Sequence, residues 1–64
     1  MPRVLVMFMD YTGLPRAWAA GPNRDQAEAE ARRQLQAYCA RKAETGDVDL
    51  SNPNRFSLHV ELLP

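Results

Sequence analysis

The run Val4-Leu5-Val6-Met7-Phe8-Met9 decides the fold of this sequence. Six consecutive apolar residues closed by Asp10 are too few to cross a membrane, and their β-branched and aromatic side chains favour a strand. A strand that is apolar on both faces requires cover on both faces. We therefore expect it to be the central strand of a sheet, with a helix packed on one face.

Alternate side chains of this strand point to opposite faces of the sheet. The face expected to meet the helix carries Val4, Val6 and Phe8. The opposite face is expected to stay open, and it carries Leu5, Met7 and Met9, with Tyr11 just beyond the strand. A slip of one residue in register would invert this assignment, and the sequence leaves that alternative open.

The composition indicates one small globular domain spanning residues 1–64. Hydrophobic residues make up 45% of the chain and charged residues 25%, with a formal net charge of zero. This balance disfavours disorder, and it disfavours a nucleic-acid binder, which usually carries a basic excess. Cys39 is the only cysteine, so no internal disulfide can form and a cytoplasmic setting without membrane attachment is expected.

Turn residues follow the central strand and predict a hairpin. Within residues 10–15, Gly13 can adopt positive φ, and Pro15 lacks the N–H that a central ladder needs. The segment Arg16–Ala20 is then expected to form a second strand at the edge of the sheet. Gly21 and the proline after it end this strand.

The most strongly marked element is a helix that begins at Asn23. Asn23 is a good N-cap and Gln26 follows at capping-box spacing, while residues 25–43 are rich in strong helix formers. Gly46 suits the position after the C-cap. The predicted buried stripe has spacings of four, four and three: Ala27, Ala31, Leu35 and Tyr38, with Cys39 at its margin.

The polar residues 44–54 predict an exposed loop, and the last strand is expected over Arg55–Leu62. Its alternating pattern predicts one buried face, formed by Phe56, Leu58, Val60 and Leu62. The order of elements therefore predicts an α+β fold of the β-β-α-β type. Its three-stranded antiparallel sheet has the order 2-1-3, with one helix packed on one face and a right-handed crossover.

No metal site or cofactor site is predicted. Asp47, Asp49 and Ser51 are spaced like the first ligands of a calcium loop. The central glycine is replaced by Asn52, and the twelfth position, which needs an acidic side chain, is Leu58. These residues therefore indicate a solvated loop.

No catalytic residue is predicted either. His59 alternates with Ser57 and Glu61, and alternate residues of one strand point side by side rather than in the relay that a nucleophile and its base require. Cys39 lies near Arg41 and Lys42, which could lower its pKa, but its place beside the predicted stripe favours a small core residue.

Arginines and Trp18 support an alternative function. Seven arginines occur in the chain, and Arg16 with Trp18 could stack on a base or anchor a protein contact. The helix arginines alternate with acidic residues around its circumference, so their field largely cancels. Ordinary packing of Trp18 is the simplest interpretation.

Part of the chain resembles a known family. Gly21 and the segment 23–27, followed by Ala31 and Leu35, are similar to the glycine, polar cap and helix face of the HicB-like antitoxin domain, which has a partial RNase H-like fold. The resemblance covers about residues 4–38. Of the family's Pro-Asp-Leu-Pro-Gly-like segment, only residues 13–15 remain. The resemblance implies a domain that binds a protein, with toxin neutralisation as one role.

Together these observations predict a small protein-interaction module that acts as a homodimer, antitoxin-like or a small inhibitor, without catalysis. The predicted dimer or partner interface is the open sheet face, whose surplus apolar side chains need cover. Its residues are Leu5, Met7, Met9, Tyr11 and Trp18. The alternative is a small nucleic-acid-binding protein that uses the arginines and Trp18.

Overall fold

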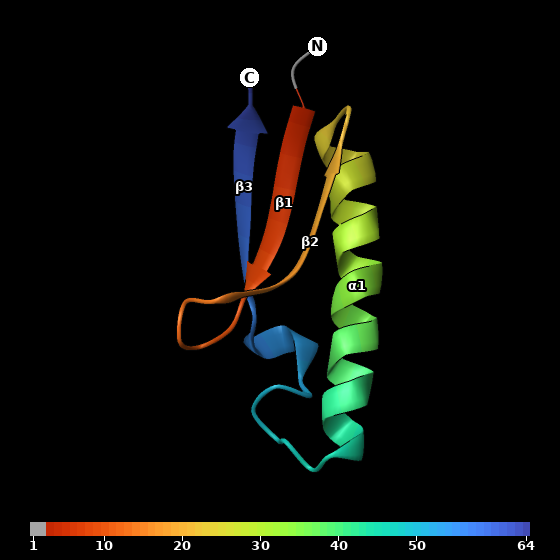
Figure 1. The fold of residues 1–64 in the computed structure, drawn as a ribbon, viewed down its shortest axis with the longest axis vertical. Coiled ribbons are helices and arrows are strands. Elements are labelled where there is room, and N and C mark those ends of the chain that lie inside the picture. Colours follow the sequence, from red (N-terminus) through yellow and green to blue (C-terminus); the bar gives the residue numbers. More distant parts are fainter. Residues whose placement is uncertain (1–2) are drawn as a thin grey trace.

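The structure, a computed structural model, describes residues 3–64 and confirms the predicted α+β fold (Figure 1). The elements in chain order are β1 (Arg3–Met9), β2 (Pro15–Gly21), α1 (Arg24–Glu44), the short 3-10 helix η1 (Pro53–Arg55) and β3 (Ser57–Leu63). The three strands form one antiparallel sheet in the predicted order β2-β1-β3.

β1 is the central strand because it pairs with both neighbours along its length. Val6 lies opposite Ala19 of β2 and Val60 of β3, which fixes the register on both sides. The pairing with β2 is interrupted once, between Phe8 and Met9, where the hairpin turn begins. The pairing with β3 is regular from Arg3 to Met9.

The helix begins and ends where the sequence predicts. The Asn23 side chain accepts a hydrogen bond from the backbone N–H of Gln26 at 3.0 Å, which satisfies one of the free donors of the first turn. Thr45 is the C-cap, and Gly46 follows with a φ of 78°, a conformation that glycine adopts without strain.

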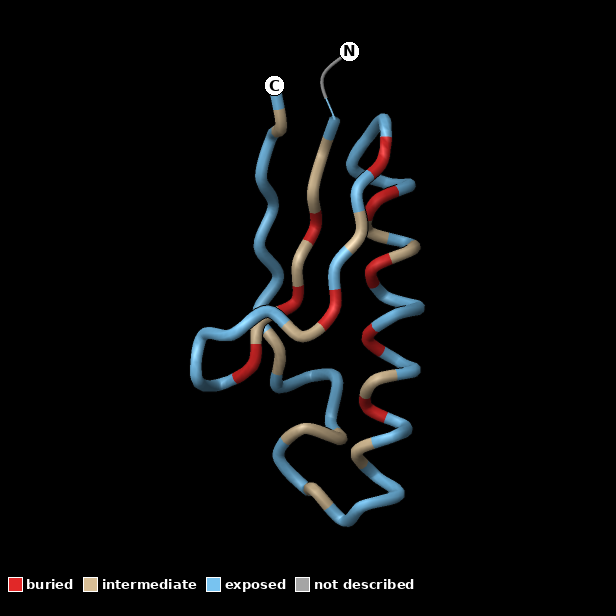
Figure 2. The backbone as a smooth tube through the Cα atoms, viewed as in Figure 1, coloured by how far each residue is buried: buried red, intermediate tan, exposed pale blue. Residues whose placement is uncertain are grey.

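α1 packs mainly on β2 and, to a smaller extent, on β1. The core lies between these three elements, as the buried positions in Figure 2 show, and it consists of Val6, Phe8, Ala17, Ala27, Ala31, Leu35 and Cys39. Val4 is half-buried against this core. The predicted helix-facing side of β1 is therefore confirmed, and the register is not inverted.

The predicted buried stripe of α1 needs one correction. Cys39 is buried and Tyr38 is half-buried, the reverse of the prediction. The buried positions follow a strict spacing of four from Ala27 onward, so the stripe continues to Cys39. Tyr38 lies to one side, where its ring meets Phe56 edge-on at 6.2 Å between centroids.

The predictions for the last strand are wrong in two respects. β3 begins at Ser57 instead of Arg55, because Asn52 caps a 3-10 turn through Pro53 and delays the strand. Its predicted buried face is also largely exposed: Leu58 is 39%, Val60 36% and Leu62 76% exposed. These side chains are on the same side of the sheet as Val6 and Phe8, but α1 lies over the other two strands.

Candidate protein-interaction surface

The open face is the side of the sheet opposite α1, and we define it by Leu5, Met7, Met9 and Trp18. Because Val6 and Phe8 point into the core, the alternate residues of β1 must point away from α1. The three β1 residues of the open face are half-buried, since cross-strand neighbours cover their flanks. Their outer surfaces remain partly accessible, and the only described helix or strand that packs on β1 from outside the sheet is α1, on the opposite face.

The open face is apolar on one side and polar on the other. Met7 lies between Trp18 of β2 and His59 of β3, and Leu5 lies between Ala20 and Glu61. The aromatic and methionine side chains thus gather over β1 and β2, while β3 contributes polar groups. An apolar area bordered by polar groups, here on the β3 side, is a common feature of protein contact surfaces.

Trp18 is the largest exposed side chain of this surface. It is 56% exposed, although its backbone lies within the hydrogen-bonded ladder of β2. Tryptophan is enriched among the residues that carry most of the binding energy at interfaces, because its ring buries a large area with few rotatable bonds. A strand position holds the indole more firmly than a loop would.

Tyr11 lies outside the strands that carry the other four predicted residues. It lies in the hairpin turn after β1 and is 70% exposed. The structure thus brings Leu5, Met7, Met9 and Trp18 together and leaves Tyr11 in the turn.

A buried carboxylate, which the sequence analysis did not identify, holds this turn in place. Asp10 Oδ1 accepts hydrogen bonds from the Thr12 hydroxyl at 2.5 Å, the Thr12 N–H at 2.8 Å and the Leu14 N–H at 3.2 Å. Its Oδ2 accepts from Arg16 Nε at 2.7 Å. The Thr12 hydroxyl and the Arg16 guanidinium hold the pKa of Asp10 well below its usual range. An aspartate followed two residues later by threonine in a turn was the available signal.

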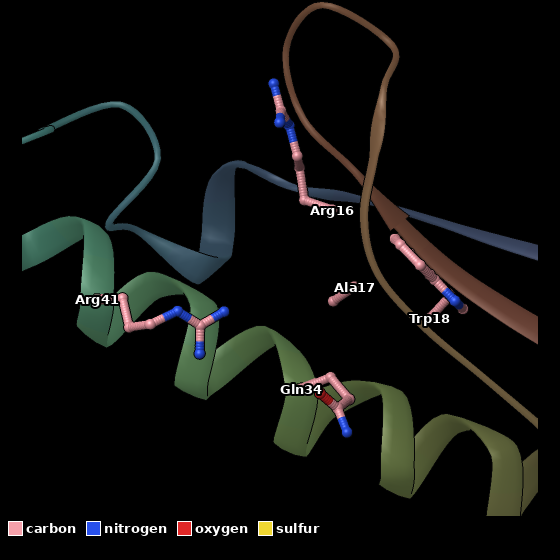
Figure 3. A pocket seen from close by; sticks show the side chains of 5 residues that line it. All are labelled: Arg16, Ala17, Trp18, Gln34 and Arg41. Atoms are coloured by element: carbon pink, nitrogen blue, oxygen red, sulfur yellow. The ribbon is translucent and has the colours of Figure 1, made fainter.

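Arg16 and Trp18 also line a shallow pocket of about 280 Å³ at the outer edge of β2. Gln34 and Arg41 of α1 form its opposite wall, and Ala17 its floor (Figure 3). The pocket brings together one aromatic and two arginine residues, the residue types that the alternative function needs, although the Arg16 guanidinium points toward the hairpin turn in Figure 3. Arg16 is already paired with Asp10, which reduces its capacity for another anion.

Acidic neighbours neutralise most of the remaining helix arginines. Arg24 and Arg32 both reach Glu28, at 3.4 and 3.1 Å, and together they lower the pKa of that carboxyl, Arg32 more strongly. Arg33 pairs with Glu30 one turn away. The helix therefore offers no continuous basic stripe over these residues.

The polar loop before β3 uses its carboxylates internally. Asp47 Oδ1 accepts a hydrogen bond from the Leu50 N–H at 3.1 Å, and Asp49 pairs with Arg55 at 2.6 Å. Within residues 3–64, no group of three or more His, Cys, Asp or Glu side chains is placed to hold a metal ion.

The remaining candidates have ordinary surroundings. Ser57, His59 and Glu61 are exposed side by side along β3. Cys39 is buried, and this burial raises the pKa of its thiol. Of the helices in residues 3–64, none combines the length and apolar character needed to span a bilayer.

A second exposed apolar surface was not foreseen. We call Leu58, Val60 and Leu62 the β3 strip; it lies on the helix side of the sheet, beyond the reach of α1. Its alternation was visible in the sequence, but the lateral position of the helix was not.

Comparison of the chain with known proteins found no matching family model, no matching curated protein and no matching solved structure.

Proposed function

We propose that this chain is a small protein-interaction module that acts as a homodimer and binds a protein through its open face. The observation that carries the proposal is the half-buried apolar row of Leu5, Met7 and Met9 beside the exposed Trp18, on the face of the sheet opposite α1. Methionine side chains suit such a surface because they adapt to a partner's shape, and tryptophan supplies a rigid anchor.

The overall dimensions also support a partner. The Cα radius of gyration is 12.1 Å, whereas a compact chain of 64 residues is expected at about 11 Å. The extents of 42 × 20 × 13 Å describe a thin, elongated body. A body of this shape encloses little interior, and among the large side chains of residues 3–64 only Val6 is completely buried. Association would give such a domain the additional apolar burial that a short chain lacks.

The assembly state is tested by light scattering coupled to size exclusion. At about 50 µM, well above a micromolar dissociation constant, we expect twice the chain mass of 7.2 kDa. A folded protein of single-chain mass at this concentration would contradict the homodimer.

The open face is tested by immobilising the wild-type chain and two variants and comparing the proteins that each of them retains. Met7→Lys places a charge at the centre of the apolar row, and Gln36→Ser changes an exposed position on α1. A protein partner should be retained by the wild type and by Gln36→Ser, and lost with Met7→Lys. Equal capture by all three would remove the open face from the proposal. An antitoxin-like or inhibitory role, the form that the resemblance implies, predicts that the captured protein has an activity that this chain suppresses.

Binding of single-stranded nucleic acid is the second candidate, because Trp18 shares one pocket with Arg16 and Arg41. Stacking of a base on the indole would change the fluorescence of Trp18, the only tryptophan. A titration with single- and double-stranded oligonucleotides at low salt tests this. An unchanged signal at micromolar protein would eliminate the candidate.

A further inference from the structure

β3 and β2 form the two edges of the sheet, and the edge at β2 carries more of the usual protection. Edge strands are commonly shielded by proline, by charged side chains (lysine above all), by a bulge or by a covering segment. β2 begins with Pro15 and Arg16, and α1 packs against it. β3 runs Ser-Leu-His-Val-Glu-Leu-Leu from Ser57 to Leu63, contains no proline, lysine or arginine, and pairs with β1 without a bulge; Glu61 is its one acidic side chain.

The side chains of β3 add an apolar contribution to this free edge. The β3 strip, which consists of Leu58, Val60 and Leu62, is exposed although it adjoins the core residues Val6 and Phe8 on the same face. α1 lies over β2 and β1, so the core is closed on the β2 side and left open on the β3 side. A second apolar strand placed beside β3 would extend this face.

The sequence of β3 is self-complementary when two copies run antiparallel around Val60. Val60 then faces its own copy, and Leu58 faces Leu62 of the other copy, twice by symmetry. On the opposite face, His59 lies across from Glu61, so an imidazole donor meets a carboxylate acceptor, again twice. Every cross-strand pair at these positions is matched in character.

Neighbouring registers lose this match. A shift by one residue places Leu58 opposite Glu61 or Val60 opposite Glu61, which sets an apolar side chain against a carboxylate. A shift by two in one direction places Glu61 opposite its own copy, and like charges directly across a ladder are unfavourable. A shift by two in the other direction places His59 opposite His59 and replaces both His59–Glu61 pairs with Ser57 opposite Glu61.

We propose that two copies of the chain join through antiparallel pairing of their β3 strands centred on Val60. The product is one six-stranded sheet in the order 2-1-3-3-1-2, with both helices on the same side. The inference rests on the homodimer of the proposed function and assigns its contact to the β3 edge. The open face of each copy then remains available for a protein partner.

Cysteine cross-linking tests the register directly. In this arrangement the two Val60 Cα atoms lie about 5 Å apart, within the range that a disulfide bridges. The two Leu62 residues are separated by four positions along the strands, about 14 Å, which is beyond that range. Under mild oxidation, Val60→Cys should form a covalent dimer at least about tenfold faster than Leu62→Cys, although Leu62 is the more exposed residue. The wild type provides the blank, because Cys39 is buried.

A charge exchange tests the pairing of His59 with Glu61. His59→Glu alone sets two carboxylates opposite each other and should weaken the dimer in light scattering. Adding Glu61→His to that variant restores an imidazole opposite each carboxylate and should restore the dimer. Both residues are exposed, so circular dichroism should show an unchanged fold in each variant.

The outcomes separate this inference from the proposed function. A wild type that stays monomeric at about 50 µM removes both the homodimer and the β3 contact. A wild-type dimer in which Val60→Cys and Leu62→Cys cross-link equally, or in which the second substitution gives no rescue, overturns the β3 contact alone. A dimer that is split by Met7→Lys and not by His59→Glu would place the contact on the open face.

Discussion

The two outer strands of the sheet differ in the residues that they place on the helix side. β2 carries small residues that are buried, and β3 carries large residues that are exposed. β2 contributes Ala17, which is 3% exposed, and Ala19, which packs against the core. β3 contributes leucines and a valine to the same side of the sheet, yet they face solvent. The difference lies in the position of α1 and not in the hydrophobicity of the strands.

The alanines of β2 explain why the helix lies over that strand. Ala17 of β2 belongs to the same buried cluster as Ala27 and Ala31 of α1, and Ala19 packs against that cluster. Small side chains on both elements permit close approach of their backbones. Gly21 extends this fit, because a Cβ there would lie 3.3 Å from the backbone nitrogen of Ala27. The larger side chains of β3 would not permit such a close approach of the helix. The small residues therefore set the helix position, and the large residues beyond it are left exposed.

The largest loss of stability is expected at Phe8 of β1, the central strand that pairs with both β2 and β3. Phe8 is buried and carries the Arg32 guanidinium 5.2 Å above its ring, while Leu58 lies opposite it on β3 and is half-exposed. Phe8→Ala should cost about 3–5 kcal/mol of unfolding free energy through lost burial and a cavity. Leu58→Ala should cost at most about 1–2 kcal/mol, since solvent already reaches it.

Urea unfolding in dilute solution, followed by circular dichroism, measures both changes. If Phe8→Ala does not fold, Phe8→Leu provides a milder variant with an expected loss under about 1.5 kcal/mol. Equal losses for the Phe8→Ala and Leu58→Ala variants would show that the β3 strip belongs to the core after all.

A smaller effect is expected from widening the helix–strand contact. Ala31 is completely buried, and Ala31→Leu should destabilise the fold by about 1–3 kcal/mol because the added atoms push α1 from the sheet. Ala37→Leu on the exposed side of α1 is the matched control, with an expected change within about 0.5 kcal/mol. Tolerance of leucine at position 31 would mean that small side chains do not set the helix position.

The Asp10–Arg16 ion pair, which links the hairpin turn to β2, should weaken in acid. The pKa of Asp10 is lower in the folded chain than in the unfolded chain, so its contribution to stability is complete above the unfolded pKa. That contribution is lost as the pH falls through the folded pKa. Asp10→Asn removes it at every pH, so the stability difference from the wild type should be largest near neutrality. It should begin to shrink below about pH 4, the unfolded value. Urea midpoints measured across this range give the comparison; a constant difference would contradict the role of the charge.

Local chemistry was sufficient to predict most of the fold. The N-cap Asn23, the glycine after the C-cap and the two-faced run of β1 each act through neighbouring residues, so their signals are readable in the sequence. The strand order followed from connection lengths and from the apolar character of β1 on both faces. Four of the five predicted interface residues share the open face for the same reason, because alternation alone determines it.

The errors in burial concern distances across the molecule. Tyr38 and Cys39 are consecutive residues whose side chains point about 100° apart around the helix, and the packing of α1 on the sheet decides which of them is buried. The burial of β3 likewise depends on how far the helix reaches across the sheet, which no residue of β3 encodes. The Arg16–Asp10 contact spans six residues, beyond the short-range patterns used for turns. The burial errors depend on neighbours that are remote in the sequence, whereas the late start of β3 and part of the Asp10 turn depend on local hydrogen bonds.

The smallest effect should occur at the tip of the β3 strip, and it sharpens the contrast between the two edges. Leu62 is 76% exposed, so Leu62→Ser removes little buried surface from a single chain. In dilute solution, where the chain is monomeric, the free energy of unfolding should change by less than about 0.5 kcal/mol. At high protein concentration the wild type should gain stability by mass action while the variant gains less, because pairing through β3 removes Leu62 from water. Thermal unfolding measured across a hundredfold range of concentration separates these cases. A loss that is equal at every concentration would mean that Leu62 stabilises the single chain, and that the exposed edge is part of its own core.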